Sequence, residues 1–204
     1  MSRPSAPPDR ESLPAWRDHA LEYLRSQLGG AAPSELGEPA FLERSPLAGE
    51  GAMVVFPFRA AVDGRHEEEY RVVVGRTEPN YYPGYNLSLE ETFDLHLGTR
   101  FMLVLGVAQY RCADDSYDPL EDARSIVARV APGRPIEDLD IAAAFAVDDQ
   151  VHTVLRCRID GTPVYIMARD APLGFNERTD LPPQVAYRLH LGQVLRREPN
   201  PADD

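Results

Sequence analysis

The sequence predicts an α+β protein made of two similar units, each with antiparallel strands flanked by helices. Three observations predict this class. Apolar residues at helical spacing open the chain, and runs rich in Val, Phe and Tyr follow, joined across Asp-Gly pairs. The tetrapeptide Leu-His-Leu-Gly then lies in a helix-like segment of each half, at 95–98 and 189–192.

An internal duplication is predicted because three short matches occur in the same order in both halves. Val-Asp-Gly at 62–64 matches Ile-Asp-Gly at 159–161, Gly-Tyr-Asn at 84–86 matches Gly-Phe-Asn at 174–176, and the Leu-His-Leu-Gly pair follows. The first repeat is expected over 13–110 and the second over 111–197. The Pro-rich, polar ends, 1–12 and 198–204, are expected to be disordered tails.

In the first half, apolar residues from Trp16 to Leu28 predict a helix that Gly29-Gly30 ends. Ala52–Val62 and Glu69–Thr77 are predicted as a hairpin, with a shorter strand beginning at Phe41. Ser88 and Glu91 have the spacing of a capping box, which predicts the start of the next helix. From Phe101 this segment is apolar all round, which fits either a buried helix end or a strand, and we favour the helix.

The second half is predicted to contain helices, strands and a closing helix in the same general order. The predicted helices are Leu120–Val130 and, shorter, Ile136–Phe145, and the predicted strands are Val151–Ile159 and Pro163–Arg169 around Asp160-Gly161. Asp180, Pro182 and Pro183 predict the start of the last helix.

The charge of the chain excludes several classes of function. There are 33 acidic and 21 basic residues, for a net charge of −12, and every basic residue is arginine. The lack of lysine excludes Schiff-base, pyridoxal and P-loop lysine chemistry. Ten acids against three arginines lie between Asp114 and Asp149, and such a field repels nucleic acid. A basic protein partner and a merely solvated acidic surface both fit this stretch.

The cellular setting follows from what the sequence lacks. No apolar run approaches the length of about 20 residues that spans a bilayer, and the N-terminal segment has no apolar signal region. Cys112 and Cys157 have no Cys-x-x-Cys partner, so we expect two free thiols. The Ala-, Arg- and Pro-rich composition indicates a GC-rich bacterial genome. We therefore expect a cytoplasmic bacterial protein without a membrane partner.

His96 and His190 lie at the border of apolar helix faces and are expected to be packed, singly hydrogen-bonded histidines, with catalysis or metal binding as the alternative. Gly98 and Gly192 each weaken a helix interior by about 1 kcal/mol relative to alanine. They therefore predict that the two helices cross there, related by a pseudo-two-fold axis.

The segment Glu78–Asn86 is predicted to be a loop in which Pro and Gly turn the chain and the tyrosines cover the end of the sheet. The alternative is that these tyrosines grip a peptide or a small ligand. No known catalytic, nucleotide-binding or calcium-binding motif is present, so no cofactor, metal or catalytic residue is predicted. The predicted binding residues are Tyr81, Tyr82, Tyr85, Asn86, Asp114, Asp115 and Asp118.

The order of elements and the acidity resemble those of acidic bacterial secretion-chaperone folds, although no motif carries the resemblance to a family. The resulting hypothesis is a non-catalytic protein-binding protein, such as an adaptor, immunity protein or chaperone, with a basic partner. The alternative is a small-molecule-binding protein or enzyme with a site at the Tyr81–Tyr85 loop and His96.

Overall fold

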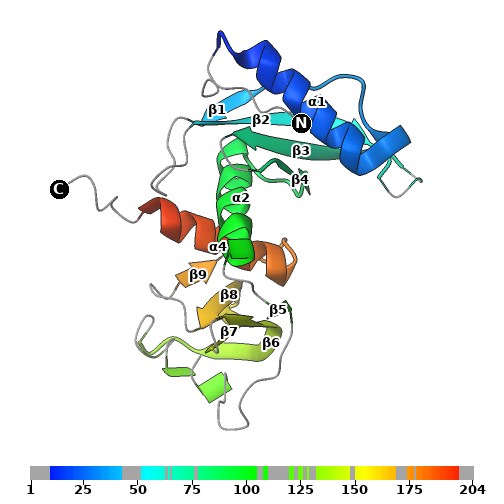
Figure 1. Cartoon of the computed structure of the whole chain (residues 1–204). Coiled ribbons are helices and arrows are strands. Elements are labelled where there is room, and N and C mark those ends of the chain that lie inside the picture. Colours follow the sequence, from blue (N-terminus) through cyan, green and yellow to red (C-terminus); the bar gives the residue numbers. More distant parts are fainter. Residues whose placement is uncertain are drawn as a thin grey trace, which may run out of the picture. The chain divides into compact units, whose positions relative to one another are not determined.

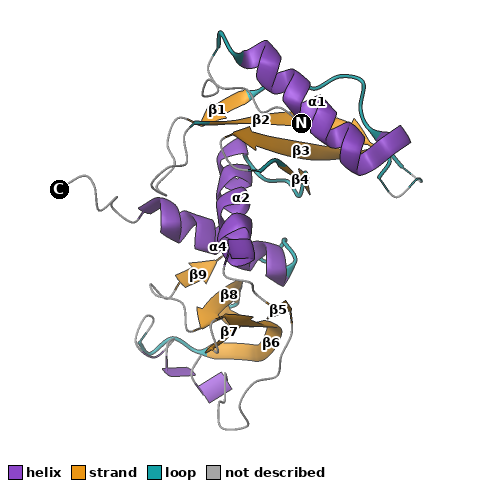
Figure 2. Ribbon diagram, viewed as in Figure 1, coloured by secondary structure: helices purple, strands orange, loops and turns teal. Residues whose placement is uncertain are grey.

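The computed structural model describes most of the chain between residues 10 and 197 (Figure 1). The described ranges are 10–42, 52–62, 64, 66–75, 78–104, 108–109, 120–121, 124–125, 128, 132–147, 150–168, 174–176 and 178–197. The chain divides into two compact units, Met1–His96 with Leu195–Asp204, and Leu97–Val194. Each unit contains one antiparallel sheet, which confirms the predicted α+β class (Figure 2).

The sheet of the first unit has the strand order β1-β2-β3-β4. Its strands are β1 (Ala40–Leu42), β2 (Met53–Ala60), β3 (Glu68–Gly75) and β4 (Asn80–Pro83). The predicted hairpin and the short strand at Phe41 are therefore confirmed. β2 and β3 pair over their full lengths, whereas β1 pairs only with Met53–Val55.

One face of this sheet is covered by α1 (Leu13–Leu28), the helix predicted from the spacing around Trp16 (Figure 1). A 3-10 turn, η1 (Gly29–Ala31), follows the helix. Alternate residues of β2 and β3 face α1 because successive side chains of a strand point to opposite faces. The core between helix and sheet contains Trp16, Ala20, Leu24, Leu36, Val54, Phe56, Phe58, Ala60, Tyr70, Val72 and Val74.

The opposite face meets α2 (Leu89–Val104), whose start confirms the predicted capping box. The Glu91 backbone N–H donates to Ser88 Oγ at 3.1 Å, and the Ser88 N–H donates to Glu91 Oε2 at 2.7 Å. Arg71 on β3 donates to Thr92 Oγ1 at 2.9 Å, which fixes the first turns of α2 on the sheet. The helix continues through Phe101 to Val104, as favoured from the sequence.

The second unit has a sheet of order β5-β6-β7-β8-β9. Its strands are β5 (Ala108–Gln109), β6 (Ile136–Val147), β7 (Gln150–Ile159), β8 (Thr162–Ala168) and β9 (Gly174–Asn176). The helix predicted over Ile136–Phe145 is wrong, because these residues form β6. Pairing with β7 overrides the helix propensity of its alanines, and two register irregularities, at 137/140 and 141/143, interrupt the ladder.

The predicted hairpin around Asp160-Gly161 is confirmed. Both turn residues have positive φ, 52° and 75°, as a two-residue type I′ turn requires. The face of Leu155, Cys157 and Ile159 packs with Val164 and Ile166 into a second core, and half-buried Leu120 lies against it. Of the predicted helix Leu120–Val130, only Leu120, Glu121, Arg124, Ser125 and Ala128 are described, and all five are helical.

The last helix, α4 (Pro183–Arg197), begins where Pro182 and Pro183 predict it. The Tyr165 hydroxyl donates to the Leu181 carbonyl at 3.1 Å, which attaches the start of the helix to the sheet of the second unit. The predicted crossing of the two Leu-His-Leu-Gly helices is present. A Cβ atom on Gly98 would overlap the Arg188 carbonyl oxygen and would lie 3.1 Å from the Gly192 nitrogen.

The two sheets share a strand order in which β1 to β4 correspond to β6 to β9. Val62 and Gly64 lie between β2 and β3, as Asp160 and Gly161 lie between β7 and β8. The third match differs, because Gly84–Asn86 lie in a turn and Gly174–Asn176 form β9. The duplication and its pseudo-two-fold axis stay predictions. The two sheets differ in the strand that precedes each hairpin: β6 pairs with β7 from end to end, whereas β1 pairs with only three residues of β2.

Across the part of the chain that the structure describes, no helix has the length and apolar character needed to cross a membrane.

Candidate functional site

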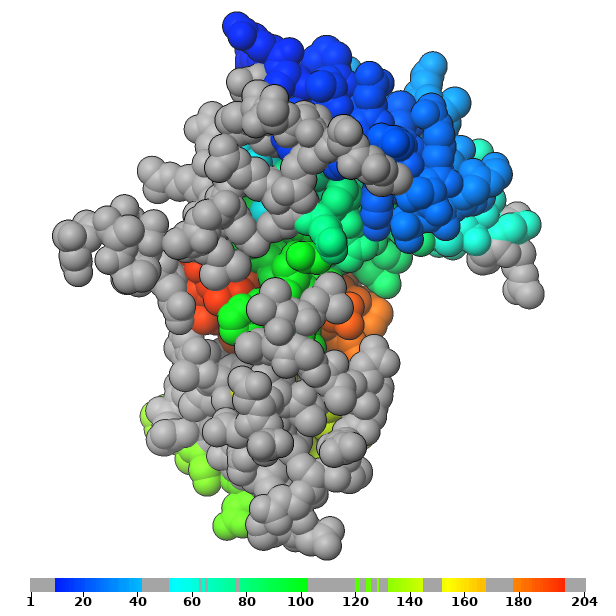
Figure 3. Space-filling view, viewed as in Figure 1, coloured from blue at the N-terminus to red at the C-terminus, as the bar shows by residue number. Residues whose placement is uncertain are grey.

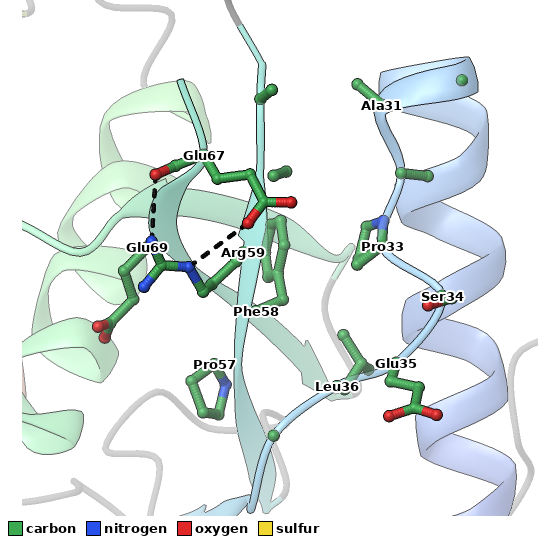
Figure 4. A pocket seen from close by; sticks show the side chains of 15 residues that line it. Ala31, Pro33, Ser34, Glu35, Leu36, Pro57, Phe58, Arg59, Glu67 and Glu69 are labelled. Atoms are coloured by element: carbon green, nitrogen blue, oxygen red, sulfur yellow. Dashed lines mark hydrogen bonds and ion pairs between the residues drawn. The ribbon is translucent and has the colours of Figure 1, made fainter. Parts of the chain in front are cut away.

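A groove of about 930 Å³ lies along β2 in the first unit (Figure 4). One wall is the segment that leaves α1, and the other is the second half of β2 with the start of β3. The segment belongs to the blue surface of the first unit in Figure 3. The groove is lined by residues 30–37, residues 57–61, Glu67 and Glu69.

The groove exists because the chain leaves the edge of the sheet at one point. The Gly37 backbone N–H donates to the Pro57 carbonyl at 2.8 Å, directly beyond the last pair between β1 and β2, Ala40 and Val55. Pro57 has no N–H to continue the ladder, and proline within a sheet is typical of an edge strand. A Cβ atom on Gly37 would lie 2.9 Å from the Pro57 ring, so a larger residue would require the ring or the segment to shift.

Beyond Pro57, the backbone of Arg59 faces the groove. The Gly84 N–H donates to the Glu69 carbonyl at 2.8 Å, so the polar backbone groups of Glu69 point toward β4. Arg59 lies opposite Glu69 in the register. Because the N–H and C=O of Glu69 point toward β4, these two residues form a non-hydrogen-bonded pair and exchange no backbone hydrogen bond. The N–H and C=O of Arg59 point away from β3, on the side where Pro57 accepts from Gly37. No described strand pairs with Arg59 on that side.

Arginine 17 holds the far wall in place. Its guanidinium donates to the Leu36 carbonyl and, at 3.3 Å, to the Gly37 carbonyl, and it lies 5.2 Å from the centre of the Phe56 ring. These contacts fix the end of the segment where it meets β2. Toward Ala31 the segment and the strand run separately, with Pro33, Leu36 and Phe58 between them, whereas Arg59 and Glu69 extend from the sheet away from the segment (Figure 4).

The floor of the groove is apolar and its rim is acidic. Phe58, Ala60 and Leu36 are 4%, 3% and 6% exposed and belong to the core under α1. The charged residues of the lining are three glutamates and one arginine: Glu35, Glu67, Glu69 and Arg59.

The arginine of the rim is already neutralised within its own hairpin. Arg59 Nε lies 3.8 Å from Glu67 Oε2, and its Nη2 donates to the Glu67 carbonyl at 3.3 Å. Both side chains are about two-thirds exposed, so this ion pair is weak. Glu69 also has an arginine partner, since its Oε1 lies 3.6 Å from Arg71 Nη2. The lining itself still has three carboxylates against one arginine, so its formal charge is negative.

Two of the predicted tyrosines lie inside the first unit. The loop predicted over Glu78–Asn86 is wrong for Asn80–Pro83, which form β4. The Tyr81 ring is half-buried and makes edge contacts with Phe58 and Tyr70. The Tyr82 side chain is buried, and its hydroxyl lies 3.1 Å from His96 Nδ1. These rings serve the packing of the unit.

Tyr85 and Asn86 lie in the turn that leads into α2. Both have positive φ, 36° and 57°, and the Leu87 N–H donates to the Gly84 carbonyl at 2.9 Å across the turn. They line a second pocket of about 410 Å³ with Glu68, Glu69, Arg71, Pro83 and Gly84. The structure thus brings together Tyr85 and Asn86 and separates them from the buried Tyr82.

The predicted acidic residues Asp114, Asp115 and Asp118 lie outside the described residues. Further along the acidic stretch, Asp138 and Asp140 of β6 lie 3.7 Å and 4.0 Å from the guanidinium groups of Arg158 and Arg156 on β7. These acids neutralise arginines of the neighbouring strand in the same sheet.

His96 and His190 are buried, as expected for packed histidines. The His96 ring also stands edge-on to Tyr82, with ring centres 6.0 Å apart. Neither of the two pockets is lined by His96 or Tyr82. No group of three or more His, Cys, Asp or Glu residues that could hold a metal ion occurs in the described ranges.

Sequence reasoning missed the groove. Its one sequence signal is Pro57 inside an otherwise apolar strand, since this residue indicates an edge. No family model, curated protein or solved structure matches the sequence.

Proposed function

We propose that this chain is a non-catalytic protein-binding protein and that the groove along β2 receives an extended segment of a basic partner. The observation that carries the proposal is that no described strand pairs with the backbone of Arg59 on the side that faces the groove. Exposed strand edges bind extended peptides by adding a strand, with backbone hydrogen bonds supplying affinity and side-chain pockets supplying specificity.

The charge of the molecule supports a basic partner. The rim has three glutamates and one arginine, and the whole chain carries a net charge of −12. Complementary charge accelerates association and selects against acidic competitors. The proposal keeps the class of function expected from the sequence and places the contact at the groove, because Tyr81 and Tyr82 pack inside the unit.

Arginine 59 allows a substitution that tests the edge alone. Arg59→Pro removes the N–H that faces the groove and leaves the bonds between β2 and β3, which Arg59 does not make. Arg59→Ala is the matched control, since it removes the guanidinium and keeps the N–H. Circular dichroism and urea unfolding establish that both variants fold.

In the test, peptides are selected from a random phage-displayed library against the immobilised full-length chain. Their affinities are then measured by fluorescence anisotropy. We expect enriched peptides to bind the wild type and Arg59→Ala with similar affinity, and to bind Arg59→Pro about tenfold more weakly, the effect of roughly one backbone hydrogen bond. Failure to enrich any peptide, or equal binding to Arg59→Pro, would contradict the proposal. The proposal would also be contradicted if the wild type and Arg59→Ala were dimers and Arg59→Pro a monomer. The groove would then be occupied by a second copy of this chain.

A further inference from the structure

The second sheet shows what fills the position that is open in the first. On the corresponding side of β7, β6 runs antiparallel from the Ile136–Ile159 pair to the Val147–Gln150 pair. In the first sheet, β1 is antiparallel to β2 and stops at the Ala40–Val55 pair. From this comparison, and resting on the proposed function, we infer that the groove takes a strand antiparallel to β2 that alternates basic and aliphatic side chains.

Arg59 and Arg156 lie at the same sequence distance from an Asp-Gly pair, although the last paired residues are Ala60 and Glu68 in the first hairpin and Ile159 and Thr162 in the second. Each is the fourth residue before the aspartate of an Asp-Gly pair, Asp63-Gly64 and Asp160-Gly161. In a two-residue hairpin the residues that flank the turn, here Ile159 and Thr162, bond to each other. Backbone hydrogen-bonding groups of successive residues along β7 point alternately to its two neighbouring strands. The N–H and C=O of Arg156 therefore point toward β6, as those of Arg59 point toward the groove. Asp140 of β6 lies opposite Arg156.

The charged partners of the arginines differ between the two sheets. In the second sheet the neighbouring strand supplies acids, since Asp140 lies 4.0 Å from Arg156 and Asp138 lies 3.7 Å from Arg158. In the first sheet Arg59 pairs with Glu67 of its own hairpin. On this face the added strand would lie next to Arg59, which is paired with Glu67, and Glu69 lies one strand further on, 3.6 Å from Arg71. The lining as a whole has three carboxylates against one arginine, and basic side chains complement that formal charge.

The alternate positions of the added strand face the other side of the sheet. There Phe58 and Ala60 belong to the core under α1, and the segment opposite contributes Ala31, Ala32, Pro33 and Leu36. Aliphatic side chains of small or moderate size fit a lining of this kind. The direction follows from β1: the N-terminal end of the strand lies toward Ala61 and its C-terminal end toward Pro57.

The test uses three acetylated, amidated hexapeptides with the full-length chain. They are an alternating arginine-valine peptide, an alternating glutamate-valine peptide, and a block peptide of three arginines followed by three valines. We expect the alternating arginine-valine peptide to bind at least about tenfold more tightly than either of the others, and Arg59→Pro to weaken it by about the same factor.

Direction is measured with a nitroxide at either end of the arginine-valine peptide, by paramagnetic broadening of amide signals. The N-terminal label is expected to broaden Ala61 more than Gly37, and the C-terminal label to do the reverse. The opposite pattern, or tighter binding of the glutamate or block peptide, would overturn the inference. If the library peptides still bound Arg59→Pro more weakly than the wild type, the proposed function would hold without this inference. If they bound Arg59→Pro and the wild type equally well, both the proposed function and this inference would be wrong.

Discussion

Gly98 of α2 lies so close to Arg188 of α4 that a Cβ atom on the glycine would overlap the arginine's carbonyl oxygen. The obstacle is backbone, which cannot rotate away as a side chain can. The same Cβ would lie 2.8 Å from the Arg188 carbonyl carbon and 3.1 Å from the Gly192 nitrogen. The glycine that weakens the helix in isolation is therefore required by the helix crossing.

Gly98→Ala is expected to lower the free energy of unfolding by about 2 kcal/mol or more, because the overlap outweighs the gain of about 1 kcal/mol in helix propensity. Urea unfolding measures the change. Gly30→Ala is the matched control, since nothing lies within 4 Å of a Cβ there. Equal stability of Gly98→Ala and the wild type would show that the helices do not meet as described.

Tyr82→Phe is expected to destabilise the first unit without affecting peptide binding. It removes a buried hydroxyl that lies 3.1 Å from His96 Nδ1 and accepts from Asn80 Nδ2 at 3.1 Å. A loss of about 1 kcal/mol is the usual effect of one such hydrogen bond. Tyr85→Phe, at an exposed turn, is the control. If Tyr82→Phe kept full stability and abolished peptide binding, Tyr82 would be an interface residue, as the sequence alone predicted.

Asp180 makes part of the stability of the chain depend on pH. Its hydrogen bond from Arg178, with Nε to Oδ1 at 2.9 Å, lowers the pKa of the carboxyl group below its ordinary value. A lowered pKa means that ionised Asp180 stabilises the fold above the pKa of the unfolded chain, about 4, and that this contribution disappears as the pH falls through the lower folded value.

The stability difference between the wild type and Asp180→Asn should accordingly stay constant above about pH 5 and shrink in more acidic solution. Urea unfolding across this pH range measures it. In an Arg178→Gln background the pH-dependent part of the difference should become smaller, because the hydrogen bond from Arg178 is the largest cause of the lowered pKa. A difference that grew on acidification would contradict the assignment.

The rim glutamates should make binding of the arginine-valine peptide sensitive to salt. Glu35→Gln removes one charge from the groove and is expected to weaken binding by a few fold at low ionic strength and less at high ionic strength. Glu38→Gln, an exposed glutamate three residues further on and outside the lining, is the control. Equal effects of the two substitutions would show that only the net charge of the chain matters.

Local signals in the sequence were sufficient for most elements of the fold. The capping box at Ser88, the Asp160-Gly161 turn and the glycines of the helix crossing each act through neighbouring residues or a strict steric demand. Ile136–Phe145 was mistaken for a helix because its alanines favour one, and only the pairing with β7 decides otherwise.

The groove was harder to predict because it depends on the point at which residues 30–37 meet the edge of the first sheet at β2. The separation of residues 30–36 from β2 is set by Gly37, Pro57 and the anchoring of the segment by Arg17, which are distant in sequence. The sequence predicts Tyr81 and Tyr82 as binding residues, whereas strand alternation places their side chains on opposite faces of a packed sheet.

Strand addition at this edge requires that the backbone N–H of Arg59 is free to bond in the unbound chain and bonded in the complex. Amide hydrogen exchange measures the protection of this N–H directly. We predict that the Arg59 amide exchanges rapidly in the free chain and becomes protected when the alternating arginine-valine peptide is bound, while the Phe58 amide, which faces β3, is protected in both states. Binding of the peptide with no change in exchange at Arg59 would contradict strand addition at this edge.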